Sequence, residues 1–193
     1  MRFAYYAKLS AADQRIYRRS DAIVTLPLPA GVMAGEFIAR IRDGLLGDDV
    51  KTVHRACQAL VDALVAGYGV PPIRIRVLAR RPSDDYGELH GLYEPEEDRK
   101  PARITVWMRT AAKAQVVAFK TFLRTIVHEV GHHLDYEHFK LEETFHTEGF
   151  YKRESSLANA LLAQLPDAAS PRPPDNGITA APASPGPNRR RGT

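Results

Sequence analysis

Residues Ala114 to Glu137 read AQVVAFKTFLRTIVHEVGHHLDYE, and their apolar side chains recur at the three- and four-residue spacing of one helix face. The opposite face carries Thr121, Thr125, His128 and His132. Two histidines four residues apart lie one turn apart on the same side of a helix, so both imidazoles can reach one metal ion. The stretch therefore predicts a long amphipathic helix that presents a metal site.

Glu129 follows the first of these histidines in the run HEVGH. At this position a glutamate is placed to take a proton from metal-bound water and not to bind the metal itself. The metal lowers the pKa of that water and polarises the carbonyl under attack, so no side-chain nucleophile is needed. A chance match to HExxH is the alternative, but the amphipathic setting favours a site. We therefore predict a zinc-dependent hydrolase, in the first place a peptidase, with Glu129 as general base.

A third metal ligand has to come from further along the chain, because catalytic zinc takes three protein ligands and leaves one position for water. His138 has the spacing HExxHxxxxxH of a metzincin, although that pattern needs glycine where Asp135 stands. Glu154 would supply a carboxylate from a later helix. His146 opens the segment HTEGFY. The residues themselves leave these three possibilities open.

HEVGHHLD followed by HTEGF resembles the SprT-like, YgjP-like and WLM minimal zinc metallopeptidases. The matching positions are His128, Glu129, His132, His146 and Phe150. The resemblance covers Asp49 to Leu165 and implies a zincin-like fold, peptidase activity on a polypeptide substrate, and His146 as the third ligand, with Glu154 as the alternative. If His146 is the ligand, Glu154 is either an outer carboxylate that orients an imidazole or an ordinary helix charge. The resemblance also implies that an extended substrate pairs with the strand before the motif helix, near Trp107 to Arg109.

The remaining periodicities predict an α+β fold with N-terminal helices, a small three-stranded sheet, the HExxH helix and a closing helix that starts near Thr147. Further helices are expected at Ala11–Arg19, Gly35–Leu46 and Asp49–Tyr68, and strands at 73–79, 88–93 and 102–109. Strands so close together favour a largely antiparallel sheet, with a mixed sheet as the alternative. We expect an N-terminal extension at 1–48, a zincin-like domain at 49–165 and a disordered, Pro-rich basic tail at 166–193.

Composition limits the compartment and the partners. No apolar run approaches the roughly 18 residues of a membrane span and the chain does not open with a signal peptide, so we expect a cytoplasmic protein without a membrane partner. The single cysteine, Cys57, excludes an internal disulfide and a four-cysteine zinc ribbon. A net charge of +4 gives only weak support for nucleic-acid binding. The alternative function is a zincin scaffold that binds nucleic acid or protein with little turnover; the sequence gives no oligomeric state.

Overall fold

The computed structural model describes residues 3–84, 87–97 and 100–165, and the predicted tail at 166–193 lies outside them. The elements are a 3-10 helix η1 (Ala4–Lys8), α1 (Ala11–Ala22), α2 (Gly35–Leu46), α3 (Val50–Tyr68), β1 (Arg74–Arg80), β2 (Ser83–Asp84), β3 (Gly87–Glu88), β4 (Gly91–Glu94), β5 (Arg103–Arg109), α4 (Phe119–Glu137) and α5 (Glu148–Leu162). The predicted α+β class is confirmed. None of the helices within these ranges is long and apolar enough to cross a membrane.

Strand β5 lies at the centre of a mixed three-stranded sheet of order β1-β5-β4. It pairs antiparallel with β4 and parallel with β1, where Ile75 is opposite Ile104. The parallel pairing arises because the chain leaves β1 through the small β2-β3 hairpin and β4 before it returns as β5. Along Trp107 to Arg109, β5 pairs with β1 on one edge; on the other edge β4 reaches only Val106, and Arg109 bridges Val116. The expected substrate pairing at Trp107 to Arg109 therefore lacks a continuous free edge. The outer edges of the sheet belong to β1 and β4. At the β1 edge the Gln58 side chain of α3 bonds the backbone of Ile73 and Ile75, at 3.0 Å each.

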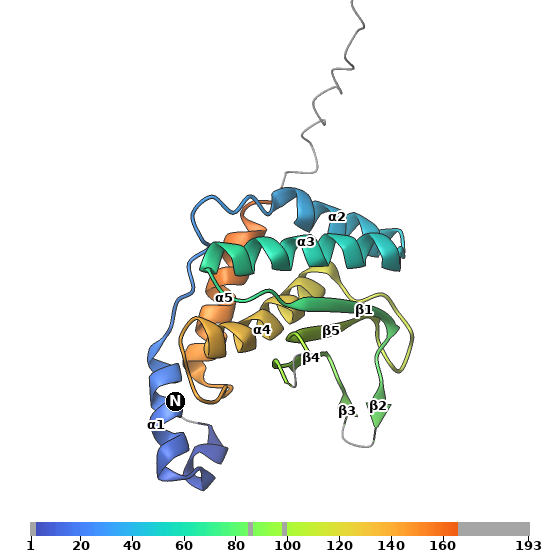
Figure 1. Cartoon of the computed structure of the whole chain (residues 1–193). Helices are drawn as coiled ribbons and strands as arrows, with labels where there is room; N and C mark the ends of the chain where they lie inside the picture. The colour runs from blue at the N-terminus through green and yellow to red at the C-terminus, as the bar shows by residue number, and fades with distance from the viewer. Residues whose placement is uncertain (1–2, 85–86, 98–99, 166–193) are drawn as a thin grey trace, which may run out of the picture.

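Helices cover one face of this sheet. The inward side chains of the strands, Ile75 and Val77 on β1 and Ile104 and Val106 on β5, are buried. Helix α3 packs on β1, and α4 packs on β4 and β5, while α2 lies beside α3 (Figure 1). Residues on both sides of the predicted boundary at residue 48 share one hydrophobic core. The N-terminal helix α2 is therefore part of the same packing unit as the motif helix.

Helix α1 lies against α5, at the end of the molecule away from α2 (Figure 1). Ser10 caps α1 by accepting a hydrogen bond from the backbone N–H of Asp13 at 3.1 Å, as its sequence position predicts. The backbone N–H of Gly149, in the first turn of α5, donates to Asp21 Oδ1 at 2.9 Å. A side chain at Gly149 would overlap the backbone of Asp21. Close approach of the two helices thus fixes where α5 starts.

Candidate metal centre

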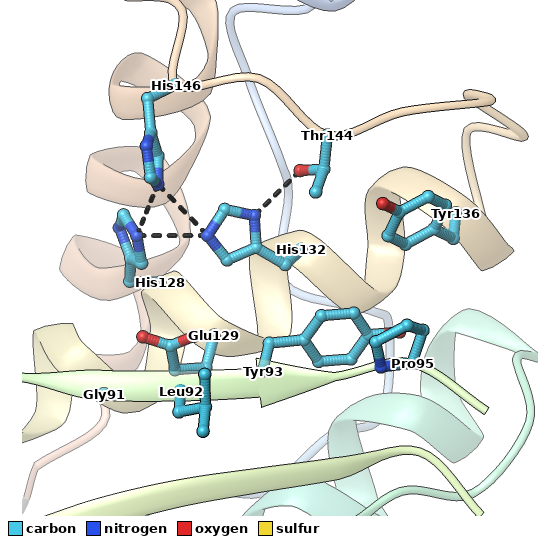
Figure 2. Close-up of a pocket in the computed structure, with 10 residues that line it drawn as sticks. All are labelled: Gly91, Leu92, Tyr93, Pro95, His128, Glu129, His132, Tyr136, Thr144 and His146. Atoms are coloured by element: carbon cyan, nitrogen blue, oxygen red, sulfur yellow. Dashed lines mark hydrogen bonds between the residues drawn. The ribbon is translucent and has the colours of Figure 1, made fainter. Parts of the chain in front are cut away.

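Helix α4 brings His128, Glu129 and His132 to one site. It begins at Phe119 and not at the expected Ala114, because Ala114 has a φ of 51° and the following residues turn back to bridge Val116 with Arg109. The apolar face of α4 is buried as its periodicity predicts, including Ile126, Val127 and Val130. The metal-site residues lie on the side that faces β4 and the start of α5 (Figure 2).

The Nε2 atoms of His128, His132 and His146 form a triangle (Figure 2). Its edges are 3.0 Å between His128 and His146, 3.2 Å between His128 and His132, and 3.2 Å between His132 and His146. Two imidazole ligands of one tetrahedral zinc ion have nitrogens about 3.3 Å apart, given metal–nitrogen distances of about 2.0–2.1 Å. The three histidines could therefore hold a metal ion with little movement.

Outer hydrogen bonds decide which nitrogen carries the proton in two of these rings. His128 Nδ1 lies 2.9 Å from Glu154 Oε2, and an ionised carboxylate only accepts, so the proton of His128 is on Nδ1. Thr144 Oγ1 donates to Asp135 Oδ2 at 2.8 Å and therefore accepts from His132 Nδ1, also at 2.8 Å. Both Nε2 atoms then direct lone pairs at each other across 3.2 Å. Such lone pairs repel each other unless a cation lies between them, and this suits a metal site.

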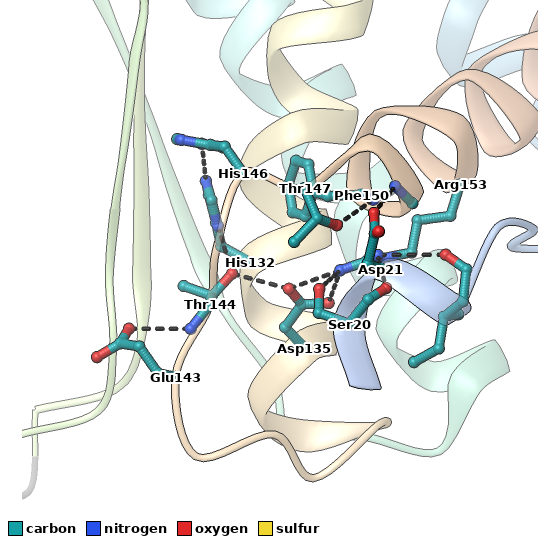
Figure 3. Close-up of polar contacts among 12 residues, drawn as sticks. Ser20, Asp21, His132, Asp135, Glu143, Thr144, His146, Thr147, Phe150 and Arg153 are labelled. Carbon is teal, nitrogen blue, oxygen red and sulfur yellow. Dashed lines mark hydrogen bonds and ion pairs between the residues drawn. The ribbon is translucent and has the colours of Figure 1, made fainter. Parts of the chain in front are cut away.

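A buried ion pair stands behind His132 (Figure 3). Arg153 Nη2 lies 2.6 and 2.8 Å from the two carboxylate oxygens of Asp135, and both side chains are almost completely buried. Arg153 Nη1 also donates to the backbone carbonyl of Ser20 at 3.0 Å. Removing two charges from water is costly, so this pair depends on its close geometry. It holds Asp135 in place, Asp135 holds Thr144, and Thr144 orients His132.

Aromatic side chains contact the three imidazoles and the backbone of His146. The Phe150 ring lies with its centre 4.8 Å from that of His132 and 5.0 Å from that of His128. Its near edge also contacts Gly131, where a larger residue would crowd the ring. Tyr5 of η1 donates its hydroxyl to the backbone carbonyl of His146 at 2.7 Å. The N-terminal segment thus helps to position a residue that lies far away in sequence.

Desolvation lowers the pKa of two of the three histidines. It lowers the pKa of His132 to about 3, with further lowering from the nearby His128 and His146. It also lowers the pKa of His146, and His128 adds to that effect. A metal ligand has to be an uncharged imidazole. The electrostatic environment therefore favours metal binding over protonation at these rings.

Glu129 is buried beside the triangle and carries a perturbed pKa. Burial raises its pKa to about 7; His128 opposes this shift and the charge of Glu154 adds to it. Gly91 of β4 lies directly against the Glu129 carboxylate (Figure 2), and a β-carbon there would overlap Oε1. A carboxyl with a pKa near neutrality next to a metal site is suited to moving protons.

Two hollows meet at His128 and Glu129 and together form a cleft along β4. The tyrosine hollow, of about 300 Å³, extends from the triangle to Tyr93, Pro95, Tyr136 and Thr144. The arginine hollow, of about 440 Å³, extends the other way to Leu89, His90, Thr121, Arg124, Thr125 and Glu154. His128 and the general-base candidate thus lie where the two hollows meet, and the other two histidines of the triangle line the tyrosine hollow.

The other candidate residues lie outside the triangle. His138 is at the end of α4, with its ring centre 5.4 Å from that of Tyr68. His133 is buried, and its Nε2 lies 3.0 Å from the carbonyl oxygen of Pro71. Glu154 lies behind His128, at the outer nitrogen. Sequence reasoning left the role of Asp135 open and did not identify Thr144, Arg153 or Gly91, because no local pattern marks them.

No protein-family model, curated protein or solved structure matches this chain. The fold and the site define an α+β domain with a three-histidine cluster beside a buried glutamate. Any functional assignment has to come from that chemistry.

Proposed function

We propose that this protein is a zinc-dependent peptidase of zincin-like fold, with His128, His132 and His146 as metal ligands and Glu129 as general base. The observation that carries the proposal is the convergence of three Nε2 atoms beside a buried carboxylate. Three imidazoles with an open fourth position are a ligand set typical of catalytic zinc. A purely structural zinc site would have no use for Glu129. The HEVGH and HTEGF motifs support the same proposal.

The chain's own residues divide the chemical work among them. When bound, zinc supplies a lowered water pKa and a polarised substrate carbonyl. Glu129 would take a proton from the attacking water and pass it to the departing amine nitrogen, because its carboxylate lines the same hollow as the three imidazoles. Glu154 and Thr144 hold the Nδ1 protons of His128 and His132. They keep the Nε2 atoms of both rings available as ligands.

The position of β4 beside the cleft favours a polypeptide substrate. The free edge of β4 runs along it, and unpaired backbone groups at a sheet edge can add an extended peptide as a further strand. The close contact between Gly91 and Glu129 would bring the backbone of such a peptide next to the general base. We therefore assign substrate pairing to β4.

The test combines metal analysis with a peptide library. Purified protein is expected to contain about one zinc per chain and to cleave library peptides, with products read by mass spectrometry. Glu129→Gln should keep its zinc and lose at least about 100-fold in kcat/KM. Glu137→Gln is the matched control, since its carboxylate lies at the end of the same helix and pairs with Lys140 at 3.4 Å. Hydrolysis by Glu129→Gln at the wild-type rate would refute the mechanism. Zinc-loaded wild type without hydrolysis would favour the alternative of a binding protein.

A further inference from the structure

The two hollows of the cleft differ in charge. Apart from the triangle and Glu129, the tyrosine hollow is lined by aromatic, apolar and hydroxyl side chains. None of its described lining residues is a lysine or arginine. The arginine hollow contains Arg124, which lies one helical turn before His128 on the same side of α4, and the carboxylate of Glu154 at 3.8 Å from Arg124 Nη1. A substrate that spans both hollows therefore meets a positive charge on one side only.

Arg124 has hydrogen-bond donors left for a ligand. Its side chain is 43% exposed, and its Nη1 lies 3.8 Å from Glu154 Oε1, beyond hydrogen-bond distance. The other oxygen of Glu154 already accepts from His128 Nδ1. A further contact from Nη1 to Ser155 Oγ is long, at 3.4 Å. A guanidinium has five N–H donors in a planar fork, which matches a carboxylate.

Strand direction decides which part of a substrate meets Arg124. β4 runs from Gly91 to Glu94; its Gly91 end borders the arginine hollow and its Tyr93 end borders the tyrosine hollow. A peptide added antiparallel runs the opposite way, so its N-terminal part lies in the tyrosine hollow and its C-terminal part in the arginine hollow. The bond to be cleaved lies where the hollows meet, at His128 and Glu129.

We infer that the site selects substrates with a carboxylate on the C-terminal side of the cleaved bond, bound by Arg124. This inference rests on the proposed peptidase function. The carboxylate is either an Asp or Glu side chain or the free C-terminus of a short peptide, because both present the same planar pair of oxygens. Loss of one charge-assisted contact of this kind lowers kcat/KM roughly 10-fold to 100-fold.

The experiment compares four peptides built on one sequence that the library test shows to be cleaved. The residue after the cleaved bond is Glu, Gln or Lys with an amidated C-terminus, or Gln with a free C-terminal carboxylate. Wild type should cleave at least one carboxylate peptide roughly 10-fold or more faster than the Gln amide peptide. The Glu amide and Gln acid peptides separate the two sources of the carboxylate.

Variants then assign the preference to Arg124. Arg124→Gln should abolish it, and Arg124→Glu should favour the Lys peptide, with zinc content unchanged in both. Arg55→Gln is the control, because Arg55 is an exposed arginine of α3 outside both hollows. Equal cleavage of the Glu, Gln and Lys amides and the Gln acid by wild type would overturn the inference and leave the peptidase proposal intact. A zinc-loaded wild type that cleaves no library peptide would overturn both.

Discussion

Replacing Thr144 with valine should weaken zinc binding without unfolding the protein. Valine has nearly the same shape as threonine but lacks the hydroxyl that links Asp135 Oδ2 to His132 Nδ1, each at 2.8 Å. Asp135 keeps its ion pair with Arg153, so no buried charge is left without a partner. The loss falls on His132, whose Nδ1 must carry a proton when its Nε2 binds a metal.

The size of the effect follows from the burial of that N–H. A buried donor without a partner costs about 1–3 kcal/mol. His132 is only 8% exposed, but Thr144 is half-buried, so water can partly replace the lost hydroxyl. We therefore expect the lower part of that range, about 1.4 kcal/mol, which corresponds to a roughly 10-fold larger Kd for zinc. This agrees with the usual loss when a partner of a ligating histidine is removed.

Competition with a fluorescent chelator measures the change in zinc Kd directly. Thr144→Ser should retain wild-type affinity because it keeps the hydroxyl. Thr121→Val is the control on α4, since Thr121 is exposed and makes no contact with the three imidazoles. Circular dichroism and thermal unfolding of the metal-free proteins check the fold. A Kd for Thr144→Val within twofold of wild type, with the fold intact, would refute the assigned role of Thr144.

Three further perturbations test other parts of the structure. Gly91→Ala should displace the Glu129 carboxylate and lower kcat/KM at least about 10-fold while the fold survives; unchanged kcat/KM would show that the contact has no catalytic consequence. Arg153→Met leaves Asp135 buried without its partner and should lower the free energy of unfolding in urea by about 3–5 kcal/mol. Arg40→Met, on the exposed face of α2, should change it by less than about 0.5 kcal/mol, and equal losses in both variants would contradict this reasoning. Cys57 is buried in α3, and burial raises the pKa of its thiol. Iodoacetamide should therefore label the protein only after unfolding. Rapid labelling of the native protein would be inconsistent with the packing of α3.

Local periodicity and local hydrogen bonds made several elements predictable. The predicted helix Gly35–Leu46 has the bounds of α2, and the closing helix predicted to start near Thr147 is α5, with Thr147 as its N-cap. Alternation from Ile73 onward identifies β1 because its even-numbered residues face outward. The adjacency of His128 and His132 is equally local. These features depend on residues a few positions apart, so the sequence by itself determines them.

Sequence periodicity is less informative where local geometry departs from the pattern. The apolar spacing extends the motif helix back to Ala114, but a positive φ at that residue delays the start of α4 to Phe119. The interval 88–93, expected as one strand, is divided between the end of β3 and the start of β4. Chain reversals of this kind are governed by tertiary packing, which a short window of sequence does not contain.

The sequence alone therefore determined the α+β class from the periodicity of its segments, and the histidine-bearing face of α4 and the candidate general base from spacing within one helix. Only the tertiary structure decided that His146 joins His128 and His132, since α1 packs against α5 and Tyr5 of η1 bonds the backbone of His146. It also decided that Glu154 and Thr144 hold the outer nitrogens and that β4 forms an outer edge of the sheet. The buried Arg153 links the backbone of Ser20, 133 residues away, to Asp135, which holds Thr144 against His132. Such contacts are selected by burial and by charge pairing across the fold, and no local repeat in the sequence encodes them.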